Sequence, residues 1–136
     1  MKRDIDLVRE LLLAIEALNP LPADAQPLTF LNLDVVRQQL ADRYSADTIN
    51  GHIRLLVDAG FLDVMREFPG NFVVMAKGLT WTGHDFLDSV RDPQIWRETK
   101  EGARKAGGFT VELLGKLARG FLAKKIEELT GVKLDL

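Results

Sequence analysis

The sequence contains no cysteine and only two histidines and two serines among its 136 residues. Without cysteine the chain has no disulfide bond, no thiolate nucleophile and no thiolate metal ligand. Neither serine lies in a nucleophile elbow, and the sequence has no glycine-rich phosphate loop and no His-x-x-x-His or Glu-x-x-His pair. We therefore expect a protein that is not an enzyme and that holds no metal or other cofactor.

Long apolar runs are lacking as well. A membrane-spanning helix needs roughly 20 consecutive apolar residues, whereas the longest candidate, LLLAI at 11–15, is followed at once by Glu16. The first ten residues, MKRDIDLVRE, carry charges on both sides of their apolar positions and do not resemble a signal peptide. We expect a cytoplasmic protein with no membrane partner.

A clear excess of basic residues is the third absence. The chain has 18 Lys and Arg against 20 Asp and Glu, for a net charge of −2. Residues 1–60 carry six basic against nine acidic side chains, and residues 101–136 carry seven against five. Because a protein that binds nucleic acid mainly through charge shows a basic excess, this balance argues against tight non-specific DNA binding.

The spacing of apolar residues predicts a series of short elements. A helical stripe begins after Asp4, and the proline-rich segment 19–27 ends that helix because proline has no amide to donate. LTFLN at 28–32 indicates a short strand, and Asp34 can cap a second helix. The stripe of the first helix consists of Ile5, Val8, Leu11, Leu12, Ile15 and Leu18.

A third helix is predicted to begin at Ser45 and to end at Gly60, which can adopt a left-handed conformation. FLDVMREF and FVVMAKG then flank the turn signal PGN, as in a β-hairpin. The order helix, strand, helix, helix, hairpin is that of a winged helix-turn-helix. We predict a mainly α chain with a small β-hairpin (α+β), divided into a winged-helix domain at 1–92 and a helical extension at 93–136. The buried stripe of the third helix is predicted to be Ile49, Ile53, Leu56 and Val57.

The stretch LTWTGHDFLDSVRDPQIW at 79–96 holds both tryptophans and invites an interpretation as an active site. Its His84 and Asp85 point about 100° apart on a helix, so they do not converge. A packed hinge explains the stretch better: Thr80 caps one helix, Gly83 allows close packing, and Asp92 with Pro93 opens the next helix. The hinge interpretation predicts a buried Trp81 and a solvated acidic edge, with Arg91 neutralising Asp85 and Asp88.

The exposed face of the third helix carries the candidate DNA contacts. Side chains there can form hydrogen bonds with base edges or phosphates, and two basic residues of the hairpin can reach the phosphate backbone of DNA. Asp47 and Asp58 on the same helix, and the uncharged turn FPGN, weigh against this hypothesis. The candidate DNA-binding residues are Thr48, Asn50, His52, Arg54, Arg66 and Lys77.

The tail after Gly107-Gly108 predicts one more amphipathic helix, capped by Thr110 and ended by Gly131. Its broad apolar face indicates a dimerisation helix, and the alternative is a helix that packs on its own domain. A role at a membrane surface is disfavoured because Glu127 and Glu128 dilute the basic charge. The predicted dimerisation residues are Leu114, Leu117, Phe121 and Ile126.

Two resemblances rest on these motifs. HIRLLVDAGFLDV resembles the end of the recognition helix in winged-helix regulators, and LTWTGHDFL resembles the Leu-Thr-x-x-Gly signature that follows the wing. MKRDIDLVRELLLAIE, LTWTGHDFLDSVRDPQIWRETKE and the glycine-punctuated tail are similar to the bacterial and prophage family of domain of unknown function 2513. This resemblance implies a bacterial or phage source and a winged-helix-like core, but no activity.

Two hypotheses of function follow. The first is a transcriptional regulator that binds double-stranded DNA as a homodimer. The alternative is a non-catalytic protein-interaction module, such as a phage adaptor with a host protein partner, because a fold does not fix a function.

Overall fold

The structure is a computed structural model of the chain, and it describes residues 1–18, 31–64 and 75–134. The chain divides into two compact units, Met1–His84 and Asp85–Leu136. This division falls inside a helix, ahead of the boundary between Asp92 and Pro93 that the sequence favours. The boundary at 92 and 93 stays a prediction about which parts fold on their own.

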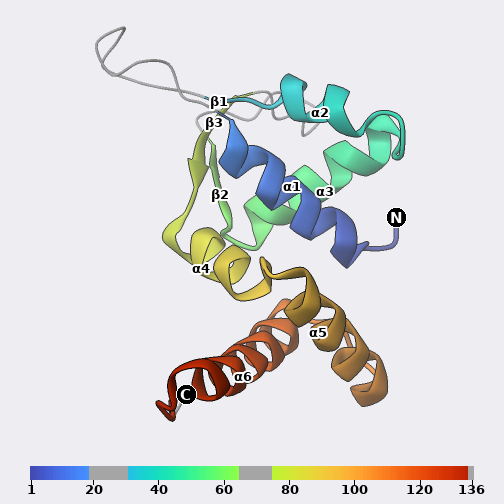
Figure 1. Cartoon of the computed structure of the whole chain (residues 1–136). Helices are drawn as coiled ribbons and strands as arrows, with labels where there is room; N and C mark the ends of the chain where they lie inside the picture. Colours follow the sequence, from blue (N-terminus) through green and yellow to red (C-terminus); the bar gives the residue numbers. More distant parts are fainter. Residues whose placement is uncertain (19–30, 65–74, 135–136) are drawn as a thin grey trace, which may run out of the picture. The chain divides into compact units, whose positions relative to one another are not determined.

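The N-terminal unit has the predicted α+β composition, with helices and a small antiparallel sheet (Figure 1). The order of its elements is the predicted one of a winged helix-turn-helix. The elements are α1 (Ile5–Ala17), β1 (Leu31–Asn32), α2 (Asp34–Leu40), α3 (Ala46–Asp58), β2 (Leu62–Val64) and β3 (Met75–Leu79), and then α4 (Trp81–Val90), which runs on into the C-terminal unit.

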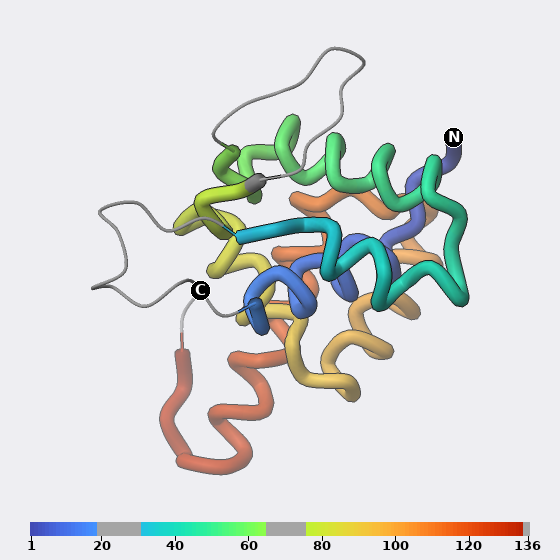
Figure 2. The backbone as a smooth tube through the Cα atoms, turned by 90° about the horizontal axis from the view of Figure 1, so that it is seen from above, coloured from blue at the N-terminus to red at the C-terminus, as the bar shows by residue number. Residues whose placement is uncertain are grey.

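The core of this unit forms around α1, which packs against α2, α3 and β3. Figure 2 shows the chain of α2 turning back through residues 41–45 into α3. Four residues of the predicted stripe of α1 are buried, whereas its end residues Ile5 and Leu18 are only partly buried; Leu7, which the stripe did not include, is buried as well. The buried residues of α1 are Leu7, Val8, Leu11, Leu12 and Ile15.

The sheet has the strand order β1-β3-β2, with both pairings antiparallel. Leu31 pairs with Ala76 on one side of β3, and Leu62 pairs with Leu79 on the other. The predicted hairpin is confirmed at its base, and the turn signal PGN lies outside the described residues. Asp63 pairs with Gly78 and the next residue, Val64, pairs with Ala76, so Lys77 is an extra residue and the β-bulge lies in β3.

Four predicted helix caps are present. The side chains of Ser45, Thr80, Asp92 and Thr110 each accept a hydrogen bond from a backbone amide in the first turn of the following helix. The predicted cap at Asp34 is wrong: its own amide donates to Asn32 Oδ1 at 2.9 Å, and Asp34 lies inside the first turn of α2. Its carboxylate pairs instead with Arg37, at 2.7 Å.

The start of α4 is fitted closely to the end of α3. The hydroxyl of Thr80 donates to the carbonyl oxygen of Gly60, which has a φ of 76°, and the Thr80 amide donates to Phe61 O at 2.9 Å. A β-carbon built on Gly83 would overlap the same Phe61 carbonyl. The sequence prediction that Gly83 permits close packing is therefore confirmed.

The C-terminal unit is a helical hairpin in which α5 (Pro93–Ala106) packs against α6 (Val111–Thr130). Gly107, with a φ of 82°, ends α5 in the left-handed region. Gly102 lies under the next helix, since a β-carbon there would be 3.5 Å from a methyl of Leu117 and 3.8 Å from the ring of Phe121. No helix within the described residues combines the length and apolar character needed to cross a membrane.

Candidate nucleic-acid interface

The helix α3 is fixed firmly to the core of the N-terminal unit. Ile49, Ile53 and Leu56 are each about 1% exposed, as predicted, because they recur at three- and four-residue spacing on one face. Ser45 caps the helix by accepting from the amide of Thr48 at 3.2 Å. The opposite face therefore has a defined position, which a surface that reads DNA requires.

The prediction that His52 lies on that exposed face is wrong, since its side chain is 0% exposed. Its Nε2 accepts a hydrogen bond from the amide of Asp4 at 2.8 Å, and its Nδ1 therefore donates to the carbonyl oxygen of Thr48, also at 2.8 Å. The sequence held the signal for this placement, because His52 lies three residues after Ile49 and four before Leu56. His52 is a structural residue that ties the start of the chain to α3.

The segment Met1–Asp4, here called the N-terminal arm, lies along α3, and sequence reasoning missed it. The side chain of Met1 covers Gly51, where an added β-carbon would overlap its sulfur atom. The exposed residues Lys2 and Arg3 lie between this contact and the bond from Asp4 to His52. The arm therefore brings two basic residues to the flank of a helix that itself bears acidic ones.

Two of the predicted DNA contacts are held by neighbouring side chains. Asn50 is partly buried, and its Oδ1 accepts from Arg37 Nε at 2.6 Å. Arg54 lies 3.3 Å from Asp58 one turn later, and its side chain is 32% exposed. Both residues were predicted to be exposed and are only partly so. Each would exchange a contact within the protein for one with DNA.

Of the remaining predicted DNA contacts, Thr48 and Lys77 lie within the described residues and Arg66 does not. Thr48 is partly exposed, and its Oγ1 accepts from the hydroxyl of Ser45 at 2.9 Å. Lys77 is exposed on β3, as a contact to the DNA backbone requires.

The turn before α3 carries a further ion pair. Arg43 lies 2.7 Å from Glu10, whose carboxylate raises the pKa of the guanidinium. Burial is the main cause that raises the pKa of the neighbouring Tyr44, and the negative charge of Asp4 raises it further. Tyr44 thus keeps its proton and can act as a hydrogen-bond donor at neutral pH.

The stretch around the tryptophans differs from its prediction in one respect. Trp81 is 83% exposed, so it does not fold over the stripe of α4, although Phe86, Leu87 and Val90 are buried as that stripe requires. Arg91 pairs with Asp88 at 2.7 Å, as predicted. Trp96 is buried, as its predicted docking role requires.

The two histidines do not form a common site in the N-terminal unit. His84 Nδ1 lies 3.9 Å from a carboxylate oxygen of Glu16, whereas His52 is buried against the N-terminal arm. Within the part of the chain that the structure describes, no three histidine or acidic side chains gather in a way that could hold a metal ion.

The predicted dimerisation residues of α6 do not share one exposed face. Leu114 is only 1% exposed, so its prediction as an intermolecular contact is wrong. Leu117 and Phe121 are partly buried and lie against Gly102 of α5. Ile126 is 37% exposed and remains available. The reason is that α5 covers much of the face that the sequence alone left without a partner.

Comparison with known proteins gives a family without a stated activity. A family model described as "Hypothetical protein (DUF2513)" matches residues 2–109. An "Uncharacterized protein" from Haemophilus influenzae is 30% identical over 128 residues, which covers 93% of this chain and 99% of the relative. No solved structure matches the chain. The chain therefore belongs to the DUF2513 family, as the resemblance of its first and middle motifs indicates.

Proposed function

We propose that the chain is a DNA-binding transcriptional regulator, of bacterial or prophage origin, that reads double-stranded DNA with α3. The observation that carries this proposal is the way in which α3 packs on the core of the N-terminal unit. Its inner face is buried through Ile49, His52 and Ile53, while Thr48 and Arg54 on other faces remain partly accessible. A winged-helix unit reads DNA with a helix held in this way, because its N-terminal side chains reach base edges in the major groove.

The charges around α3 set the expected mode of binding. Lys2 and Arg3 of the N-terminal arm and Lys77 of β3 supply basic charge, while Asp47 and Asp58 of α3 oppose it. Attraction to phosphate is therefore weak, and affinity must come from direct contacts to base edges. We expect binding that is specific for one sequence and poor on random DNA.

The direct test is retardation of the DNA upstream of the gene by purified protein, over a range of salt concentrations. Arg54→Ala should cost roughly 1–3 kcal/mol of specific affinity, as for a residue that contacts a base edge. Lys77→Ala should weaken binding to all sequences alike and lower the salt slope by about 1. Lys116→Ala is the matched control, because Lys116 is an exposed lysine of the C-terminal unit. Unchanged affinity in both α3 and β3 variants contradicts the proposal.

A second candidate, a protein-interaction module with a host protein partner, is favoured by the exposed Trp81. A tryptophan carries a large apolar surface, and such residues are enriched among those that dominate binding energy at protein interfaces. At 83% exposure, Trp81 presents this surface to solvent at the start of α4.

Substitution of Trp81 separates the two candidates. Trp81→Ala removes no core contact, so the protein should stay folded, and an adaptor should lose its partner in a pull-down. Thr82→Ala, at the next exposed position, is the control. A regulator should retain DNA binding in both variants, whereas an adaptor should show no DNA binding in any form of the protein.

The regulator proposal includes a homodimer. A two-fold dimer brings two recognition helices to the two halves of a palindromic site. The surface through which the chain pairs with a second copy cannot include the predicted Leu114, because that side chain is buried.

A further inference from the structure

The apolar surface of the C-terminal unit is uncovered at one end. Early in α6, Leu114 and Ala118 are buried, whereas Leu129 near its C-terminal end is 74% exposed. Beyond the helix, Val132 and Leu134 are also exposed. A contiguous apolar patch on the surface of a protein often marks an interaction surface.

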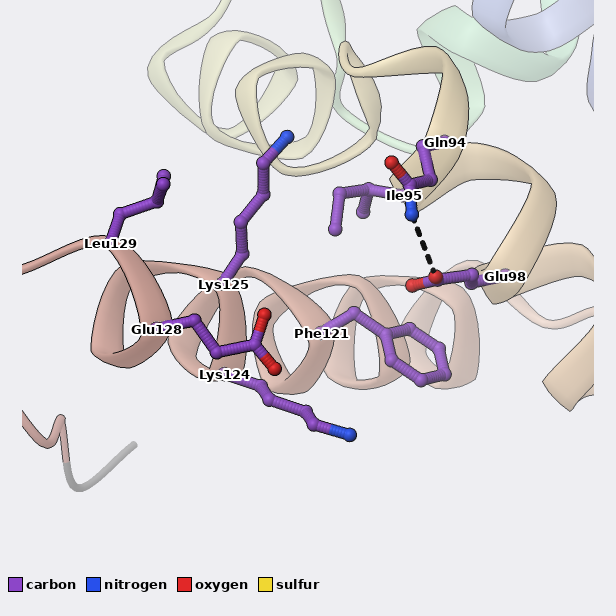
Figure 3. Close-up of a pocket in the computed structure, with 8 residues that line it drawn as sticks. All are labelled: Gln94, Ile95, Glu98, Phe121, Lys124, Lys125, Glu128 and Leu129. Carbon is purple, nitrogen blue, oxygen red and sulfur yellow. Dashed lines mark hydrogen bonds between the residues drawn. The ribbon is translucent and has the colours of Figure 1, made fainter.

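Next to this end lies a groove between the start of α5 and the second half of α6, here called the α5–α6 groove (Figure 3). It encloses about 300 Å³, and its apolar lining comes from Ile95, Phe121 and Leu129. Figure 3 shows Phe121 and Ile95 reaching into the space between the two helices. The groove is large enough to accept an apolar side chain from another molecule.

The rim of the α5–α6 groove carries charges of both signs. Lys124 and Glu128 lie one helical turn apart on α6, and both are exposed. Lys125 is occupied by an ion pair with Asp92, at 2.8 Å, which fixes the start of α5 to α6. A partner whose charges were all of one sign would be attracted by one of Lys124 and Glu128 and repelled by the other.

We propose that the α5–α6 groove binds the same groove of a second copy of the chain, with the two α6 helices antiparallel. In a two-fold arrangement of this kind each residue meets its contact twice, once in each direction. Lys124 then faces the partner's Glu128, and Glu128 faces the partner's Lys124. The exposed Leu129 of each copy enters the apolar part of the other groove.

This arrangement accounts for both unusual features of the surface. A second copy of the chain supplies both a projecting leucine and an accepting groove. Antiparallel pairing also matches both rim charges, because reversing the helix direction exchanges the positions of Lys124 and Glu128. The inference rests on the homodimer of the proposed function. It leaves out the predicted contacts Leu114 and Leu117 and keeps Phe121, which lines the α5–α6 groove.

The test is the oligomeric state of the full chain, measured by sedimentation over a range of concentrations. The wild-type protein should be a dimer, and Leu129→Glu should make it monomeric while circular dichroism shows an unchanged helix content. Lys124→Glu and Glu128→Lys should each weaken the dimer roughly tenfold, which corresponds to about 1.4 kcal/mol. The double variant, with both changes, should recover wild-type affinity because the two charges are exchanged in each copy.

The control is Lys116→Glu, which makes the same charge change on α6 at a residue that does not line the groove and pairs with Glu112 at 3.1 Å. It should leave the dimer intact. A wild-type monomer at high micromolar concentration overturns the proposal, and so does a dimer that Leu129→Glu leaves intact. Failure of the double variant to recover overturns the antiparallel pairing.

DNA retardation with the same variants keeps the two proposals apart. If Leu129→Glu is monomeric and still binds half of a palindromic site weakly, both proposals hold. A dimer that obeys the charge exchange but binds no DNA supports the α5–α6 groove and contradicts the regulator. DNA binding by a protein that stays monomeric contradicts the groove alone.

Discussion

The two units of the chain bury their residues differently. In the N-terminal unit, contacts far apart in sequence close around α3: Asp4 bonds to His52, and Gly83 lies directly on Phe61. The C-terminal unit contains the end of α4 and the hairpin of α5 and α6, and it leaves Leu129 in solvent. The first unit should therefore tolerate little change in side-chain volume, whereas the second leaves a large apolar side chain exposed to solvent.

The largest expected effect is at His52. His52→Ala leaves the amide of Asp4 without its acceptor and opens a cavity in a fully buried position. We expect the free energy of unfolding to fall by roughly 2–4 kcal/mol, measured by urea denaturation. Thr48→Ala, at the partly exposed end of the same helix, is the control. If His52→Ala lowers the free energy of unfolding by less than Thr48→Ala does, the contact between Asp4 and His52 contributes little to stability.

Gly83 tests the same closure by adding volume. Because a β-carbon at Gly83 would overlap the carbonyl of Phe61, Gly83→Ala should destabilise the protein by roughly 1–3 kcal/mol in spite of the better helix propensity of alanine. Thermal unfolding of the purified variant gives the measurement. An unchanged melting temperature would mean that α4 shifts without cost.

The matching change in the C-terminal unit should have the opposite sign. Gly120 is exposed on α6, and a β-carbon there would meet nothing within 4 Å. Gly120→Ala should therefore stabilise the protein by about 1 kcal/mol through helix propensity alone. Urea denaturation decides this, and a destabilised variant would reveal a close contact at Gly120 that the hairpin does not contain.

The smallest expected effect is a change in acid sensitivity at Asp92. Lys125 and the amides of Ile95 and Gln94 lower the pKa of this carboxyl from 3.8 to about 2. Because the pKa is lowered in the folded state, the ionised carboxyl stabilises the fold at pH values above 3.8. This stabilisation is lost as the pH falls from 3.8 towards 2. Asp92→Asn keeps a capping side chain and removes the charge.

Acid unfolding followed by circular dichroism measures this difference. The wild-type protein should lose more stability than Asp92→Asn between pH 3.8 and 2, and Asp88→Asn provides the same change in net charge away from a helix cap. Equal acid profiles for all three proteins would show that the pair between Asp92 and Lys125 does not link α5 to α6 in solution.

Local signals in the sequence predicted much of the fold. Caps at Ser45, Thr80, Asp92 and Thr110 were predictable because each depends on one side chain and the amides two or three residues later. The stripe of α3 was predictable from its period, and the same period places His52 inside. The prediction that His52 contacts DNA was based on its residue type. Its position in the apolar stripe of α3 was the better predictor of where it lies.

The remaining differences depend on contacts between elements distant in sequence. Whether Trp81 is covered depends on what packs over the start of α4, which no local pattern contains. Likewise, the burial of Leu114 and the exposure of Leu129 follow from where α5 crosses α6. The period of a helix predicts an apolar face, but a single sequence does not say which half of that face the next helix covers.

The bond between Asp4 and His52 also provides a spectroscopic reporter. An amide hydrogen held by a buried ring nitrogen exchanges slowly with solvent, and near the end of a chain such protection is unusual. Hydrogen exchange at Asp4 therefore reports whether the N-terminal arm is docked on α3. Adding DNA should alter this single exchange rate if the arm moves to meet a phosphate, and should leave it unchanged if the docked arm is itself part of the binding surface.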